Sequence, residues 1–149
     1  MPQIQTEIFI NAPLGKVYET AKNIEAFPEF LDDISSVKIL ERTESVYISE
    51  WVGGVEVMNS RVSITWTEED IWDDEQHICT FKALSGNWEN YDGVWKFEEK
   101  EGGTLMSMDL LANVNVPLIG PIIINLVGKL TKSNIDNMFL GLKNHIENN

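Results

Sequence analysis

The chain has 149 residues and a formal charge of −13, from 24 acidic and 11 basic residues. Nucleic-acid binding rests on Lys and Arg side chains that neutralise phosphates, so this charge argues against a nucleic-acid partner and also against an anionic membrane surface. Apolar residues make up 43% of the chain, which is typical of a folded protein rather than a disordered one. The length predicts one domain, residues 1–149.

No segment indicates export or membrane insertion. The N-terminus passes into a strand pattern without the basic and apolar regions of a signal peptide. The apolar run 116–127 is too short to span a bilayer and contains two prolines. Cys79 is the single cysteine, which excludes an intramolecular disulfide and, in an apolar strand pattern, predicts a buried inert thiol. We therefore expect a cytoplasmic protein with no integral membrane segment.

The chain begins with one strand and two short helices. Alternating isoleucines predict a half-buried strand at 3–10. Asn11 is a candidate cap for a short helix around 17–21. A second, aromatic helix is predicted over 25–33, with Pro28 in its first turn.

Six further strands follow, joined by short connections. A polar turn at 43–45 and glycine pairs at 53–54 and 102–103 mark hairpins, which make neighbouring strands antiparallel. The stretch 68–75 holds six carboxylates in eight residues. It lacks the spacing of a calcium loop, so we interpret it as a solvated hairpin tip. The predicted strands are 37–42, 46–52, 55–68, 77–84, 88–99 and 104–116.

The last predicted element is a long amphipathic helix from Pro121 to Ile146. One apolar stripe steps by three or four residues along it, which marks a single buried face. Its members are Ile124, Val127, Thr131, Ile135, Met138, Leu142 and Ile146. At about 1.5 Å per residue such a helix is roughly 40 Å long and needs a large apolar partner. We expect that partner to be one curved antiparallel sheet.

Four short motifs occur in order along the chain: Ile10–Pro13 followed by Val17-Tyr18, then Phe27–Leu31, then Gly86–Trp88 with Asp92–Phe97, and finally Gly102–Thr104. Together they resemble the START-like (SRPBCC, helix-grip) superfamily, and within it the polyketide cyclase/dehydrase-type branch. The resemblance implies an α+β fold with a seven-stranded curved antiparallel sheet wrapped around the C-terminal helix, two short helices between strands one and two, and a cavity. Known members bind sterols, lipids, quinones, plant hormones or polyketide chains, and some are catalysts.

Two residues are catalytic candidates. Aromatic-polyketide cyclases use a pocket arginine, but at the matching strand end this sequence has Glu69 or Asp70. Arg61, nearer the start of the strand, is the candidate replacement, or it is simply solvated. Glu50 is a candidate acid/base if its face points inward, where burial raises a carboxyl pKa. If the register differs by one residue, Glu50 is an ordinary surface acid.

Other chemistry finds little support in the sequence. The two histidines, His77 and His145, are isolated from acidic partners at ligand spacing, so we expect no metal site. No phosphate loop, nucleophile elbow or dinucleotide fingerprint occurs, so we expect no cofactor.

In the fold that the resemblance implies, a set of large apolar side chains points toward one space. They either line a cavity there or fill the space as a dry core. They are Phe27, Phe30, Leu31, Trp51, Trp66, Phe81, Tyr91, Trp95, Met106, Met108, Leu126 and Leu130. The leading hypothesis is that this space binds a hydrophobic, ring-bearing small molecule such as a lipid, quinone or polyketide-like compound. The alternatives are an aromatase/cyclase acting on a poly-keto chain tethered to an acyl carrier protein, and a ribosome-associated interaction protein.

Overall fold

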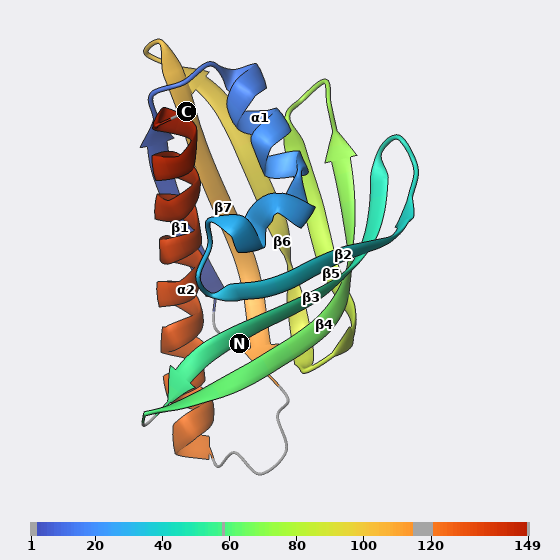
Figure 1. Ribbon diagram of the computed structural model, residues 1–149, viewed down its shortest axis with the longest axis vertical. Helices are drawn as coiled ribbons and strands as arrows, with labels where there is room; N and C mark the ends of the chain where they lie inside the picture. The colour runs from blue at the N-terminus through green and yellow to red at the C-terminus, as the bar shows by residue number, and fades with distance from the viewer. Residues whose placement is uncertain (1–2, 58, 115–120, 149) are drawn as a thin grey trace.

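The computed structural model describes residues 3–57, 59–114 and 121–148, with side chains for all of these except 55–57, 114 and 121–128. One strand, a helix and a short 3-10 helix come first, and six strands and a long helix follow (Figure 1). The elements are β1 Gln3–Ile10, α1 Leu14–Lys22, η1 Ile24–Glu29, β2 Ile34–Arg42, β3 Val46–Val57, β4 Ser60–Asp73, β5 Ile78–Gly86, β6 Trp88–Lys100, β7 Gly103–Val114 and α2 Pro121–Glu147.

The seven strands form one antiparallel sheet in the order β1-β7-β6-β5-β4-β3-β2. Strands β2 to β7 are a meander, and β1 pairs with β7 from Gln3 opposite Leu111 to Ile10 opposite Thr104. The sheet curves around α2, with β1 beside the helix and the β3–β4 hairpin reaching across toward its N-terminal half (Figure 1). The predicted helix-grip architecture is confirmed, including the two short helices between β1 and β2.

The two short helices begin and end differently from the prediction. Asn11 does not cap α1, which starts at Leu14 after Pro13 and has no side-chain cap. The backbone N–H of Asn11 instead donates to the Glu147 carboxylate at 2.8 Å, which ties β1 to the end of α2. The predicted helix over 25–33 is the 3-10 helix η1, which ends at Glu29.

The hairpin predicted at Gly53-Gly54 is wrong, because both glycines lie inside β3. The chain reverses four residues later, where Val57 pairs with Ser60 and Asn59 takes a left-handed conformation with φ of 67°. A Cβ on Gly54 would lie 2.6 Å from Nε of Arg61, so the guanidinium of β4 lies directly against this glycine. Close approach of a neighbouring side chain, rather than a turn, therefore accounts for Gly54.

The hairpin tip predicted at 68–75 is also wrong over most of its length. Strand β4 continues to Asp73, and the turn comprises residues 74–77. The Asp73 carboxylate accepts the backbone N–H groups of Glu75 and Gln76 at 3.0 Å and closes this turn. The first acids of the run therefore lie on a strand with one face turned to the interior.

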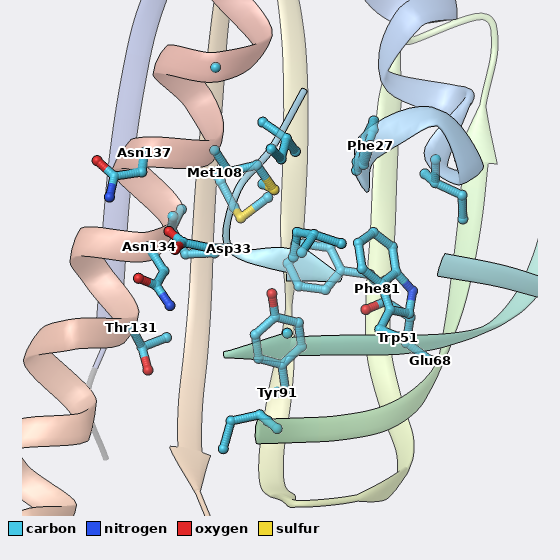
Figure 2. Close-up of a pocket in the computed structure, with 18 of the residues that line it drawn as sticks. Phe27, Asp33, Trp51, Glu68, Phe81, Tyr91, Met108, Thr131, Asn134 and Asn137 are labelled. Carbon is cyan, nitrogen blue, oxygen red and sulfur yellow. The ribbon is translucent and has the colours of Figure 1, made fainter. Parts of the chain in front are cut away.

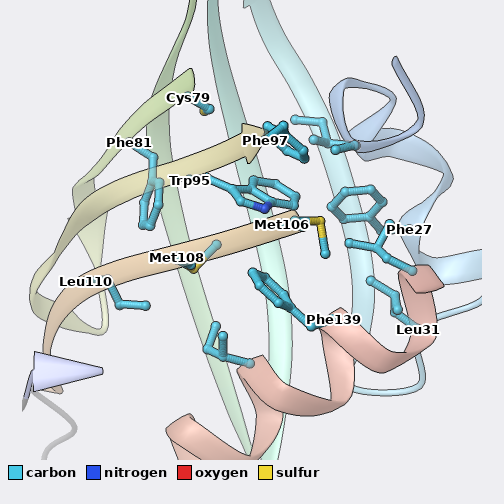
Figure 3. Close-up of a cluster of buried hydrophobic side chains, with 14 of the residues drawn as sticks. Phe27, Leu31, Cys79, Phe81, Trp95, Phe97, Met106, Met108, Leu110 and Phe139 are labelled. Carbon is cyan, nitrogen blue, oxygen red and sulfur yellow. The ribbon is translucent and has the colours of Figure 1, made fainter. Parts of the chain in front are cut away.

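The core lies between the concave face of the sheet and α2 (Figure 3). Phe139 of α2 stacks on Trp95 of β6, with ring centroids 6.2 Å apart, and Met106 of β7 is fully buried nearby. Within the described part of the chain, no helix combines the length and the apolar character needed to cross a membrane.

Polar bonds hold α2 mainly to β1. The Lys143 ammonium donates to the Phe9 carbonyl at 2.7 Å, and the Thr6 hydroxyl donates to the Asp136 carboxylate at 2.6 Å. On the opposite side, the Asn134 amide donates to the Gly54 carbonyl of β3 at 3.0 Å.

Candidate ligand-binding cavity

A cavity of about 350 Å³ lies between the concave face of the sheet, the 3-10 helix η1 and α2. Polar side chains of α2, among them Thr131, Asn134 and Asn137, form one side, and the strands supply the facing side (Figure 2). The curvature of the sheet and the length of α2 hold the two sides apart, so the aromatic side chains do not fill the whole space.

Most of the predicted lining residues do reach this cavity. They are Phe27, Phe30, Leu31, Trp51, Trp66, Phe81, Tyr91, Trp95 and Met108. Met106 is an exception, because it is fully buried in the core beside Phe97 and Trp95 and takes no part in the lining (Figure 3). Leu130 is half-buried and packs against the core without lining the cavity. The side chain of Leu126 lies outside the described residues.

Aromatic rings form a continuous wall on the sheet side. Trp51 and Trp66 stack with centroids 5.8 Å apart and planes inclined by 9°. Trp88 and Tyr91 stack at 4.7 Å, and Trp66 contacts both of them. At the η1 end, Phe30 stacks on His145 at 4.0 Å. This places His145 against an aromatic residue that lines the cavity.

Neither catalytic candidate lies in the cavity. Ser49 and Trp51 face inward on β3, so Glu50 between them is exposed on the outer face, opposite Thr67. Arg61 is exposed and lies against Gly54 on the same outer face. The inward reading of Glu50 is therefore wrong, and the surface alternative holds for both residues.

The interior acids are Glu68 and Asp70 of β4, which the sequence interpretation assigned to a solvated turn. Their exposed fractions are 6% and 3%, and both line the cavity. The Trp66 indole N–H donates to Glu68 Oε1 at 2.7 Å. Burial, together with the charge of Glu68, raises the pKa of Asp70 well above its usual range. Asp70 therefore keeps a proton, which it donates to Glu68.

Burial also raises the pKa of Glu68, although hydrogen bonds from Asp70 and the Trp66 indole oppose that effect. The two carboxyls therefore titrate as one unit, and their burial favours a state in which they share one proton. Burial of the Tyr91 phenol and of the Cys79 thiol, together with the nearby Glu68 and Asp70 carboxyls, raises the pKa values of both groups. Both therefore stay protonated. As the sequence predicts, Cys79 is a buried thiol with no thiolate character.

The described side chains include no group of three or more His, Cys, Asp or Glu that could hold a metal ion. The Glu68–Asp70 pair holds two hydrogen-bonded carboxyl groups next to each other inside an aromatic cavity. Such a pair can donate and accept protons or hydrogen bonds without a further partner.

Comparisons with known proteins agree with this architecture. A family model described as polyketide cyclase / dehydrase and lipid transport matches residues 10–139. No curated protein is significantly similar to the sequence. The chain is similar to the solved structure of TTHA0849 from Thermus thermophilus, with 29% identity, 97% of each chain covered and a TM-score of 0.86.

Two further solved structures show the same fold. The Zhui aromatase/cyclase from Streptomyces sp. R1128 is 13% identical over 98% of this chain and 93% of that chain, with a TM-score of 0.82. A START superfamily protein from Mycobacterium smegmatis is 16% identical over 98% of this chain and 97% of that chain, with a TM-score of 0.77. The family match confirms the polyketide cyclase/dehydrase-type resemblance that the sequence motifs indicate, and the solved structures confirm the START-like fold.

Proposed function

Because this chain belongs to the polyketide cyclase / dehydrase and lipid transport family, we propose that its cavity binds a hydrophobic, ring-bearing small molecule. The aromatic wall of Trp51, Trp66, Trp88 and Tyr91 carries the proposal, since stacked rings present flat apolar faces to a ligand ring. The cavity volume of about 350 Å³ lies within the range of small-molecule sites.

A fluorescent ring compound of low polarity, N-phenyl-α-naphthylamine, tests this proposal. We expect saturable binding, with quenching of tryptophan emission as the probe stacks on the wall. Met138→Trp extends a half-buried lining residue of α2 into the space and should weaken binding at least about tenfold. Ser133→Trp adds the same ring at an exposed position outside the lining and should leave binding unchanged. Equal affinity in the two variants, at equal melting temperature, would place the probe elsewhere.

We propose as a second candidate an aromatase/cyclase activity on a carrier-tethered poly-keto chain, which the Glu68–Asp70 pair inside the cavity favours. The Glu68 carboxylate takes a proton from a methylene between two ketones. The resulting enolate carbon forms a bond to a remote ketone carbon, and the alkoxide produced takes the Asp70 proton. Transfer of the proton from Glu68 to Asp70 restores the pair, and loss of water then allows aromatisation.

This candidate predicts which substitutions change the products. E68Q/D70N removes the acid and the base while keeping both side-chain shapes, so cyclised product should fall at least about 100-fold. Arg61→Ala should leave the product profile unchanged, because Arg61 is exposed outside the cavity. Chromatography of products from a carrier-tethered poly-keto substrate checks both. Unchanged cyclisation by E68Q/D70N would leave ligand binding as the function.

A further inference from the structure

Some residues that line the apolar cavity carry buried polar atoms with no hydrogen-bond partner among the described residues. They are Oδ1 of Asp70 and the indole Nε1 of Trp88 and of Trp95, all in lining residues. Asp70 is 97% buried as a residue, its exposed fraction being 3%. Buried polar groups are normally paired, so each unpaired atom marks a position where a bound molecule can supply the missing bond. Asp70 Oδ1 needs a donor, and the two indoles need an acceptor.

The charge of the cavity has one sign. Asp32 and Asp33 lie among its lining residues beside η1, and Glu68 and Asp70 lie inside. Of the described side chains that line it, none is Lys, Arg or His. The sequence of residues 115–128, whose side chains the structure does not describe, contains no such residue either. An anionic group would therefore enter beside these four acids, with no Lys, Arg or His among the described lining residues to offset their charge.

The aromatic wall favours the opposite charge. Trp66, Trp88 and Tyr91 line the same space as the acid pair, and aromatic rings attract cations. A cationic donor would thus meet a carboxyl oxygen that lacks a partner and electron-rich ring faces together. A neutral hydroxyl would gain the hydrogen bond to Asp70 but not the charge attraction.

We propose that the ligand is a ring-bearing molecule with a hydrogen-bond donor, an ammonium or a hydroxyl group, that binds Asp70 Oδ1, and that the cavity rejects carboxylates. This inference rests on the proposed binding function and specifies the chemical class of its ligand. The ammonium group is the stronger form of that donor here, because it also offsets the charge shared by Glu68 and Asp70.

Four compounds with one ring system and different polar groups test the inference: β-naphthylmethylamine, β-naphthol, β-methylnaphthalene and β-naphthoate. Each is titrated at neutral pH as a competitor of N-phenyl-α-naphthylamine. We expect the amine to bind tightest, the phenol next and the hydrocarbon third, with β-naphthoate at least about tenfold weaker than the amine. Binding of β-naphthoate within about threefold of the amine would overturn the inference.

The net charge of −13 would by itself disfavour an anion, so the variants separate this general effect from the cavity. E68Q/D70N removes the one negative charge of the pair, and Glu69→Gln removes one charge from the residue between them, which lies near Lys82 outside the cavity. We expect E68Q/D70N to abolish the preference for the amine and Glu69→Gln to preserve it. An equal preference in both variants would overturn the inference.

The outcomes also distinguish this inference from the proposed function on which it rests. If the probe and β-methylnaphthalene fail to bind, the cavity takes no ring compound and both are wrong. If all four compounds bind equally well, the ring-binding function stands and the donor site is wrong. Should E68Q/D70N fail to fold, the single variant Asp70→Asn and the wild-type series still give the comparison.

Discussion

Phe139→Ala is expected to lower the free energy of unfolding by about 3–5 kcal/mol. Phe139 is 1% exposed and connects α2 to the sheet by stacking on Trp95. Removal of the ring leaves a void between α2 and β6, because the paired strands on the other side cannot move inward to fill it. Urea denaturation followed by far-UV circular dichroism measures the change.

The neighbouring Leu140 supplies the matched control. It is 49% exposed, so Leu140→Ala should change the free energy of unfolding by no more than about 0.5 kcal/mol. If Phe139→Ala costs less than about 1 kcal/mol with an unchanged denaturant slope, the packing of α2 on Trp95 does not hold the two layers together.

The second large effect is a pH dependence caused by the Glu68–Asp70 pair. Both carboxyls have raised pKa values in the folded chain, so above about pH 4 the folded pair retains a proton that the unfolded chain releases. The stability that this proton retention provides is present at low pH and is lost as pH rises. For each retained proton, stability relative to E68Q/D70N should fall by up to about 1.4 kcal/mol per pH unit above about pH 4, until the folded pair ionises.

Measurement requires melting curves of wild type, E68Q/D70N and Glu69→Gln across about pH 4 to 8. Acids with lowered pKa values, such as Asp74 and Glu147, lose their contribution as pH falls through their folded pKa, and they are common to all three proteins. Their effect therefore cancels in the difference between wild type and variant. A difference between wild type and E68Q/D70N that stays constant or grows with rising pH would show that the pair ionises as it does in water.

The fold followed from the sequence because periodicity decides it. The alternation of β4, the three-or-four step of α2 and the short turns required one antiparallel sheet around one helix. The prediction for residues 68–75 was wrong because it followed the acidic composition of this stretch rather than the strand alternation that runs into it. Val62, Ile64 and Trp66 share one face of β4, and the same alternation continued for two steps places Glu68 and Asp70 inward. The density of acids at 68–75 instead suggested a turn.

The face of Glu50 and the position of Arg61 depend on information that local sequence does not carry. The inward face of β3 is set by its pairing with β4, for example Trp51 opposite Trp66, and a shift of one residue would invert every side chain. The Gly53-Gly54 pair has turn composition, yet both glycines lie within β3, where a Cβ on Gly53 would lie 3.3 Å from the Asp33 carbonyl oxygen and one on Gly54 would lie 2.6 Å from Nε of Arg61. Contacts with residues distant in sequence therefore determine that Gly53-Gly54 lies within a strand, which the dipeptide alone does not show.

The polar bonds of α2 have a mechanical consequence. Among the described residues, Thr6, Phe9 and Asn11 at the β1 side are each tied to the helix, whereas Gly54 of β3 is tied to it through Asn134. A small rotation of α2 about the β1 side would keep the first three bonds and break the Asn134–Gly54 bond. We therefore expect a ligand to pass between α2 and the β3–β4 hairpin, where opening breaks the Asn134–Gly54 hydrogen bond, a contribution of roughly 1 kcal/mol.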